Sequence, residues 1–95
     1  MLYKMYKNLF AVGPPIERRA LFAKLYAKHG VELIGVWKNK DNPLEYYMIT
    51  KYRDEEHYRK FVEAVKNIPE YIEMTQKISE KRISAETINL VLEEF

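Results

Sequence analysis

The spacing of apolar residues along the chain predicts four strands and three helices. Short runs rich in apolar and aromatic residues predict strands at 2–12, 31–38 and 44–52, with a fourth strand within 82–95. Helices are expected at 16–29, 54–68 and 69–81. The clearest helical stripe, with i, i+3, i+4 and i+7 spacing, consists of Tyr58, Phe61, Val62, Val65 and Ile68.

Turn and capping residues mark the ends of these elements. Pro14 and Pro15 separate the first strand from the first helix, where a missing backbone donor costs nothing. Gly30 suits the left-handed residue that ends a helix, and Asp54 suits an N-cap. The resulting order, β-α-β-β-α-(α)-β, is typical of a ferredoxin-like α+β sandwich, in which helices cover one face of a four-stranded antiparallel sheet.

The central strands carry apolar side chains on both faces, which is unusual for an antiparallel sheet with one wet face. Strict alternation divides the second strand into Val31, Leu33, Gly35 and Trp37 on one face and Ile34 and Val36 on the other. It divides the third strand into Leu44, Tyr46, Met48 and Tyr52 against Tyr47 and Ile49. Helices of one chain can cover only one face, so a second subunit is expected to cover the other in a homodimer. The alternative is coverage by the third helix and the C-terminal tail.

Composition narrows the class of function. We expect residues 1–95 to form one domain, since 47% of them are hydrophobic. The 16 basic residues are nearly balanced by 14 acidic residues, whereas a nucleic-acid-binding protein normally has a concentrated excess of basic residues.

The chain has no cysteine, so thiolate chemistry is excluded and a cytoplasmic location is expected. No apolar run approaches the roughly 20 residues of a membrane span. Two histidines without a spaced carboxylate make no metal signature, so neither metal nor cofactor is expected.

The centre of the chain resembles the NIPSNAP family of the dimeric α+β barrel superfamily. The matching residues are His29-Gly30-Val31, Leu33, Gly35, Val36, Pro43-Leu44, Lys51-Tyr52 and Asp54. The sequence departs from the family pattern at Thr50 and Lys51, where the family has Trp and Arg. Antibiotic-biosynthesis-type monooxygenases share the layout and are a close competitor. The resemblance implies a dimer with a cavity between each sheet and its helices, but no single activity.

Aromatic side chains and a histidine are the candidates for a site in that cavity. The predicted ligand-binding residues are Tyr6, Phe22, Trp37, Tyr46, Tyr47, Tyr52 and Phe61. The candidates for catalysis are His29, Tyr46 and Tyr52. The alternative is that the tyrosines are core and interface aromatics and that His29 caps or packs against its helix. His57, beside Glu55 and Glu56, is expected to make only solvent or ion-pair contacts.

Two functions are compatible with these residues. The first is a homodimeric protein that binds a small apolar or aromatic molecule, or acts as an interaction module, without chemistry. The second is a cofactor-independent enzyme of monooxygenase or isomerase type that uses cavity tyrosines and His29. Haem degradation is disfavoured, because the related branch uses an Asn, a Trp and a His, and Trp37 lies on the wrong strand for it.

Overall fold

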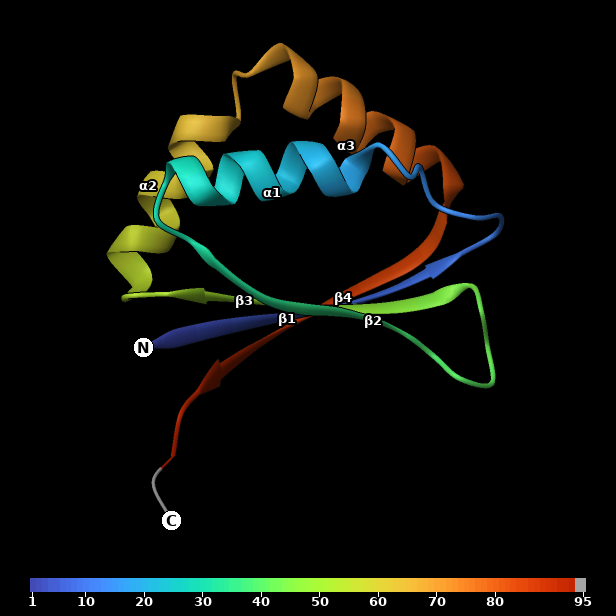
Figure 1. Cartoon of the computed structure of the whole chain (residues 1–95), viewed down its shortest axis with the longest axis horizontal. Coiled ribbons are helices and arrows are strands. Elements are labelled where there is room, and N and C mark those ends of the chain that lie inside the picture. Colours follow the sequence, from blue (N-terminus) through green and yellow to red (C-terminus); the bar gives the residue numbers. More distant parts are fainter. Residues whose placement is uncertain (94–95) are drawn as a thin grey trace.

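A computed structural model, which describes residues 1–93, has one antiparallel sheet with three helices on one of its faces (Figure 1). The elements are β1 (Leu2–Phe10), α1 (Arg18–Lys28), β2 (Glu32–Lys38), β3 (Glu45–Tyr52), α2 (Glu55–Val65), α3 (Pro69–Lys81) and β4 (Arg82–Val91). The strand order β2-β3-β1-β4 is that of a ferredoxin-like sheet. The predicted fold class is confirmed.

The capping residues act as the sequence predicts. Gly30 has a φ of 68°, a left-handed conformation that glycine adopts without steric cost, and it follows the end of α1. The Asp54 carboxylate accepts a hydrogen bond of 2.8 Å from the backbone N–H of His57, which satisfies one free donor at the start of α2. The end of α1 and the start of α2 are therefore set by residues whose local conformation or hydrogen bonding suits a helix terminus.

The core between the sheet and the helices is divided into two clusters. One cluster consists of Leu25, Tyr26, Val31, Tyr52, Phe61 and Val65. The other consists of Phe10, Met74 and Ile78. The two clusters lie toward opposite ends of the sheet. Leu21 and Phe22 of α1 pack against both of them.

A bulge in β2 changes which side chains share a face. Leu33 pairs with Thr50 and Gly35 pairs with Ile49, so Ile34 is an extra residue opposite one step of β3. Beyond the bulge, Val36 lies opposite Met48 on the helix side, whereas Trp37 lies opposite Tyr47 on the outer side. The strict alternation predicted for this strand is therefore wrong, and Val36 joins Leu33 rather than Ile34.

The outer face of the sheet is rich in apolar side chains. The register places on it Tyr3, Met5, Leu9, Trp37, Tyr47, Ile49, Ile88 and Leu90. All three helices lie on the opposite side (Figure 1), so α3 does not cover this face as the alternative required. The tail residues 94–95 lie outside the described part of the chain. A second, largely apolar face is thus present, as predicted.

His57 is buried and ties α2 to the end of α1, contrary to the predicted solvent or ion-pair contacts. Its Nδ1 accepts a 3.1 Å hydrogen bond from the backbone N–H of Arg53. In the neutral ring the proton is then on Nε2, which donates to the His29 carbonyl oxygen at 2.8 Å. Only 6% of His57 is exposed. The side chain satisfies two backbone groups that water would otherwise have to reach.

We predict that His57→Phe lowers the free energy of unfolding by about 2 kcal/mol, because a ring of similar size leaves two partly buried backbone groups without their protein partner. Urea unfolding followed by circular dichroism measures the change. Arg59→Ala, an exposed substitution on the same helix, is the control and should change stability by less than about 0.5 kcal/mol. Equal stability of His57→Phe and the wild type would contradict the structural role.

Candidate functional site

A cavity of about 650 Å³ lies between the sheet and the helices, in the space between the two core clusters. Its floor on the sheet includes Tyr6, Asn8, Phe10, Leu33, Val36, Tyr46, Met48, Tyr52, Ala85 and Thr87. Its helical walls include Arg18, Arg19, Phe22, Ala23, Tyr26, Tyr58, Phe61, Val62, Tyr71, Thr75 and Ile78. Ligand sites of small molecules commonly have volumes of about 300–1,000 Å³ and mostly apolar linings.

The phenol groups enter the cavity because of strand and helix periodicity. Tyr6 on β1 and both Tyr46 and Tyr52 on β3 occupy alternate positions that point toward the helices. Tyr26 follows Phe22 by one helical turn, and Tyr71 comes from the first turn of α3. Aromatic contacts hold these rings, with centroid distances of 5.3 Å between Tyr26 and Phe61 and 6.0 Å between Phe22 and Tyr71.

Burial keeps several of these tyrosines protonated. It raises the pKa of Tyr6 and of Tyr26 far above the ordinary value of a phenol, and the neighbouring Tyr52 raises that of Tyr6 further. Burial likewise raises the pKa of Tyr52 and of Tyr71. The Thr50 hydroxyl donates to the Tyr52 hydroxyl oxygen at 3.4 Å. At neutral pH these phenols are therefore hydrogen-bonding groups, and phenolate bases are disfavoured.

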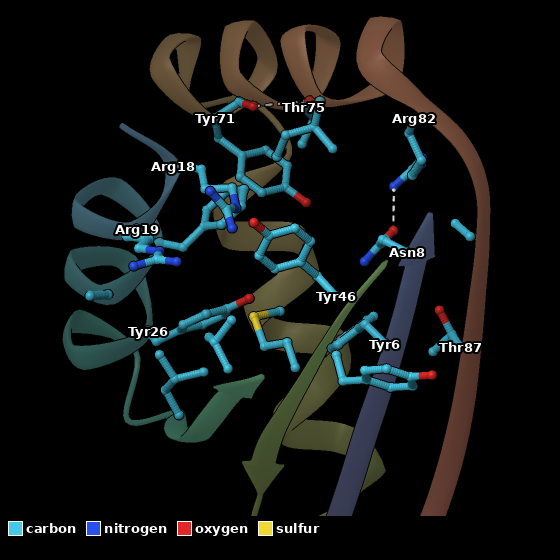
Figure 2. A pocket seen from close by; sticks show the side chains of 18 of the residues that line it. Tyr6, Asn8, Arg18, Arg19, Tyr26, Tyr46, Tyr71, Thr75, Arg82 and Thr87 are labelled. Atoms are coloured by element: carbon cyan, nitrogen blue, oxygen red, sulfur yellow. Dashed lines mark hydrogen bonds between the residues drawn. The ribbon is translucent and has the colours of Figure 1, made fainter. Parts of the chain in front are cut away.

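One end of the cavity is lined by arginines. Arg18 and Arg19 come from the first turn of α1, and Arg82 comes from the start of β4 (Figure 2). The Arg82 Nη1 donates to the Asn8 Oδ1 at 3.3 Å. The Arg18 guanidinium lies 5.3 Å from the centre of the Tyr46 ring. In Figure 2 the hydroxyl groups of Tyr46 and Tyr71 lie between the side chains of α1 and those of β4.

The structure brings together most of the predicted ligand-binding residues. Tyr6, Phe22, Tyr46, Tyr52 and Phe61 all line the cavity. Tyr47 borders it, but its hydroxyl donates to the Glu45 carboxylate, and its register places its side chain on the outer face.

Trp37 does not line the cavity, contrary to the prediction. The bulge places it opposite Tyr47 on the outer face, where 48% of it is exposed. Its ring lies over Gly35, since a Cβ at that glycine would come within 2.7 Å of the indole.

His29, the candidate for catalysis, is also outside the cavity lining. Its ring packs edge-on against Phe61, with centroids 5.7 Å apart. Its buried Nε2 has no hydrogen-bond partner within residues 1–93. The position matches the packed alternative, and Phe61 stands between His29 and the group of tyrosines.

Several polar cavity residues were not singled out from the sequence. They are Asn8, Arg18, Arg19, Thr75, Arg82 and Thr87. One signal was available for Arg18 and Arg19, because cations in the first turn of a helix oppose its dipole and so need another reason to be there. Lys4 was also missed. It is 5% exposed, with its Nζ 3.9 Å from the centre of the Tyr58 ring, a cation–π contact that replaces part of its hydration.

The cavity offers recognition groups at both ends. Its inner part, lined by Phe22, Tyr26, Met48 and Phe61, is apolar and aromatic, and three arginines line the other end beside the Tyr46 and Tyr71 hydroxyls. Within residues 1–93, no group of three or more His, Cys, Asp or Glu side chains is arranged to hold a metal ion. No helix in that part of the chain is long and apolar enough to cross a membrane.

The fold and its cavity place the protein in the class of ferredoxin-like α+β structures with a space between sheet and helices. Among solved structures, the chain is similar to a NIPSNAP domain protein from Burkholderia xenovorans, with a TM-score of 0.73 and 22% identity over 100% of this chain and 97% of that chain. It is also similar to the protein Atu4242 from Agrobacterium tumefaciens, with a TM-score of 0.81 and 17% identity over 100% of this chain and 96% of that chain.

A third similar structure is SnoaB, a cofactor-independent oxygenase from Streptomyces nogalater. The TM-score is 0.65, with 13% identity over 99% of this chain and 95% of that chain. No protein-family model matches the sequence, and no curated protein sequence matches it. The resemblance to NIPSNAP proteins, with antibiotic-biosynthesis monooxygenases as the next group, is thus confirmed at the level of the fold.

We predict that the buried phenol of Tyr26 makes stability fall at alkaline pH. An unfolded tyrosine ionises near pH 10, whereas folded Tyr26 keeps its proton, so the free energy of unfolding decreases as the pH rises above about 10. Between pH 9 and pH 11, Tyr26→Phe should lose about 1 kcal/mol less stability than the wild type. Urea unfolding at both pH values measures the difference. Parallel losses in the two proteins would contradict a buried, protonated phenol.

Proposed function

We propose that the protein is a cytoplasmic homodimer that binds a small apolar or aromatic molecule between its sheet and its helices. The observation that carries this proposal is the cavity of about 650 Å³ in the middle of the fold. Several lining residues, among them Arg19, Arg82 and Ala85, are exposed, so the cavity is open to solvent and a ligand has a way in. A space of this size, ringed by aromatic and phenol side chains, has the volume and the lining of a ligand site.

The protonation of the tyrosines supports binding over catalysis. Protonated phenols such as Tyr26 and Tyr52 position a ligand through hydrogen bonds, but they are poor proton acceptors. Within residues 1–93 the cavity lining contains no histidine. The enzymatic alternative is supported by the likeness to the oxygenase SnoaB, which is a likeness of fold. The side chains of this cavity favour the binding function.

The outer face of the sheet supports the homodimer. Four of its charged residues form ion pairs, Lys7 with Glu45 at 3.9 Å and Lys51 with Glu32 at 3.6 Å, and most of the surrounding side chains are apolar. The chain exposes 6709 Å², whereas a monomeric protein of 11.4 kDa exposes roughly 5,800 Å². The difference is comparable with the roughly 800 Å² that each partner buries in a standard interface, although the open cavity contributes to it. An isologous pairing of two such faces buries them without a third component.

We predict that the cavity binds N-phenyl-1-naphthylamine, a neutral aromatic probe that fluoresces in apolar surroundings. Ala23→Trp places a large ring at the cavity wall and should weaken binding at least about tenfold, since the probe and the indole compete for one volume. A fluorescence titration measures the affinity.

Ala20→Trp is the matched control for this experiment. Ala20 is exposed on the same helix and does not line the cavity, so its substitution should leave the affinity unchanged. Equal effects of the two substitutions, or binding that does not saturate at one probe per chain, would contradict a cavity site.

We also predict that the wild type has roughly twice the 11.4 kDa mass of one chain in size-exclusion chromatography with light scattering. Ile49→Glu places a charge in the middle of the outer face and should give a folded monomer, because an unpaired carboxylate is costly to bury. Ile72→Glu, at a 48% exposed position of α3, should remain a dimer. A monomeric wild type would overturn the homodimer.

A further inference from the structure

The arginines at one end of the cavity are brought together from distant parts of the sequence. Three of the five arginines of the chain, Arg18, Arg19 and Arg82, line the cavity. The ion pairs within residues 1–93 all use a lysine, and none includes these arginines. Glu86 borders the cavity too, but its register opposite Lys7 directs its side chain to the outer face. The positive charge at this end therefore has no carboxylate partner in the described part of the chain.

Arg18 is held in place without being neutralised. Its Nη1 donates to the Pro15 carbonyl oxygen at 2.8 Å, and its guanidinium plane lies near the Tyr46 ring. Burial and the neighbouring Arg19 lower the pKa of its guanidinium, which means that its surroundings oppose the charge. The first turn of α1 contains no acidic residue, so the helix dipole opposes the charge as well. An anion beside Arg18 would offset the unfavourable effects of burial, of Arg19 and of the helix dipole on its charge.

Arg82 approaches the same end from β4. Its hydrogen bond with Asn8 fixes the guanidinium above the last part of β1, on the side opposite α1 in Figure 2. Arginine presents several N–H donors in a planar fork that matches a carboxylate, and it remains charged at all physiological pH values. Arg18 and Arg82 each keep donors that the contacts within residues 1–93 do not use.

The inner part of the cavity has the opposite character. Phe22, Tyr26, Met48 and Phe61 line it, and the phenols there are kept neutral by burial. A ligand that fills the whole cavity therefore meets apolar and aromatic groups along its body and positive charge at one end.

We propose that the ligand is an amphipathic organic acid, with an aromatic or aliphatic body in the inner cavity and one carboxylate, or a similar monoanionic head, between Arg18 and Arg82. This inference rests on the ligand-binding function proposed above and adds the charge of the ligand and its orientation. The head lies at the N-terminal end of α1, and the body points toward Tyr52 and Phe61.

Two probes with the same aromatic skeleton test the charge. N-phenyl-1-naphthylamine is neutral, and 8-anilinonaphthalene-1-sulfonate is the same molecule with one sulfonate, which stands in for the carboxylate. The wild type should bind the sulfonate at least about tenfold more tightly than the neutral probe. Added salt should weaken the binding of the sulfonate only. Arg18→Gln and Arg82→Gln should each lower the ratio of the sulfonate affinity to the neutral-probe affinity about tenfold. Arg59→Gln, an exposed arginine of α2 outside the lining, is the control.

A second variant avoids removing any arginine. Ala85→Glu introduces a carboxylate at an exposed lining position opposite Asn8, where it can pair with Arg82. It should weaken binding of the sulfonate more than binding of the neutral probe. If the neutral probe binds while these variants leave the sulfonate affinity at its wild-type value, the arginine site is overturned and the apolar cavity stands. If neither probe binds the wild type, the ligand-binding function itself fails, and the acid site fails with it.

Discussion

The pairing of β1 with both β3 and β4 is the constraint on which the rest of the structure depends. β1 is central, and its register with β3 runs without a break from Leu2 opposite Tyr52 to Leu9 opposite Glu45. This register decides which side chains face the helices and which face outward. Lys4, Tyr6 and Asn8 face the helices and the cavity, whereas Tyr3, Met5 and Lys7 face outward. A slip of one residue would exchange the two sets and turn Tyr6 and Asn8 away from the cavity.

The cavity follows from how the helices rest on this sheet. At one end, α2 is anchored to the α1–β2 connection through His57 and the His29 carbonyl oxygen, and the first core cluster packs there. At the other end, α3 packs through Met74 and Ile78 against Phe10. Between these contacts the aromatic rings line a space without filling it. An unfilled space costs the folded state dispersion and hydrophobic stabilisation. A molecule that binds there would supply these contacts and so stabilise the folded state.

The sequence predicted the elements and their order because those depend on local signals. Proline, glycine and aspartate at the ends of segments, and the helical spacing of α2, need no knowledge of distant contacts. The face of Trp37 could not be derived from alternation, because one extra residue, Ile34, reverses the parity beyond it. Gly35 within a strand was the available sign of a bulge. His57 and Arg82 were beyond local reasoning, since their partners His29 and Asn8 are far away in the sequence.

The proposed ligand site and the proposed dimer face lie on opposite faces of the same strands. Met48 and Ile49 are neighbours on β3, the first lining the cavity and the second on the outer face. Tyr6 and Met5 have the same relation on β1. A ligand that ordered the inward side chains and the backbone that carries them would couple ligand affinity to dimer affinity through one free energy. By thermodynamic linkage, whatever factor the ligand adds to dimer affinity, dimerisation adds to ligand affinity.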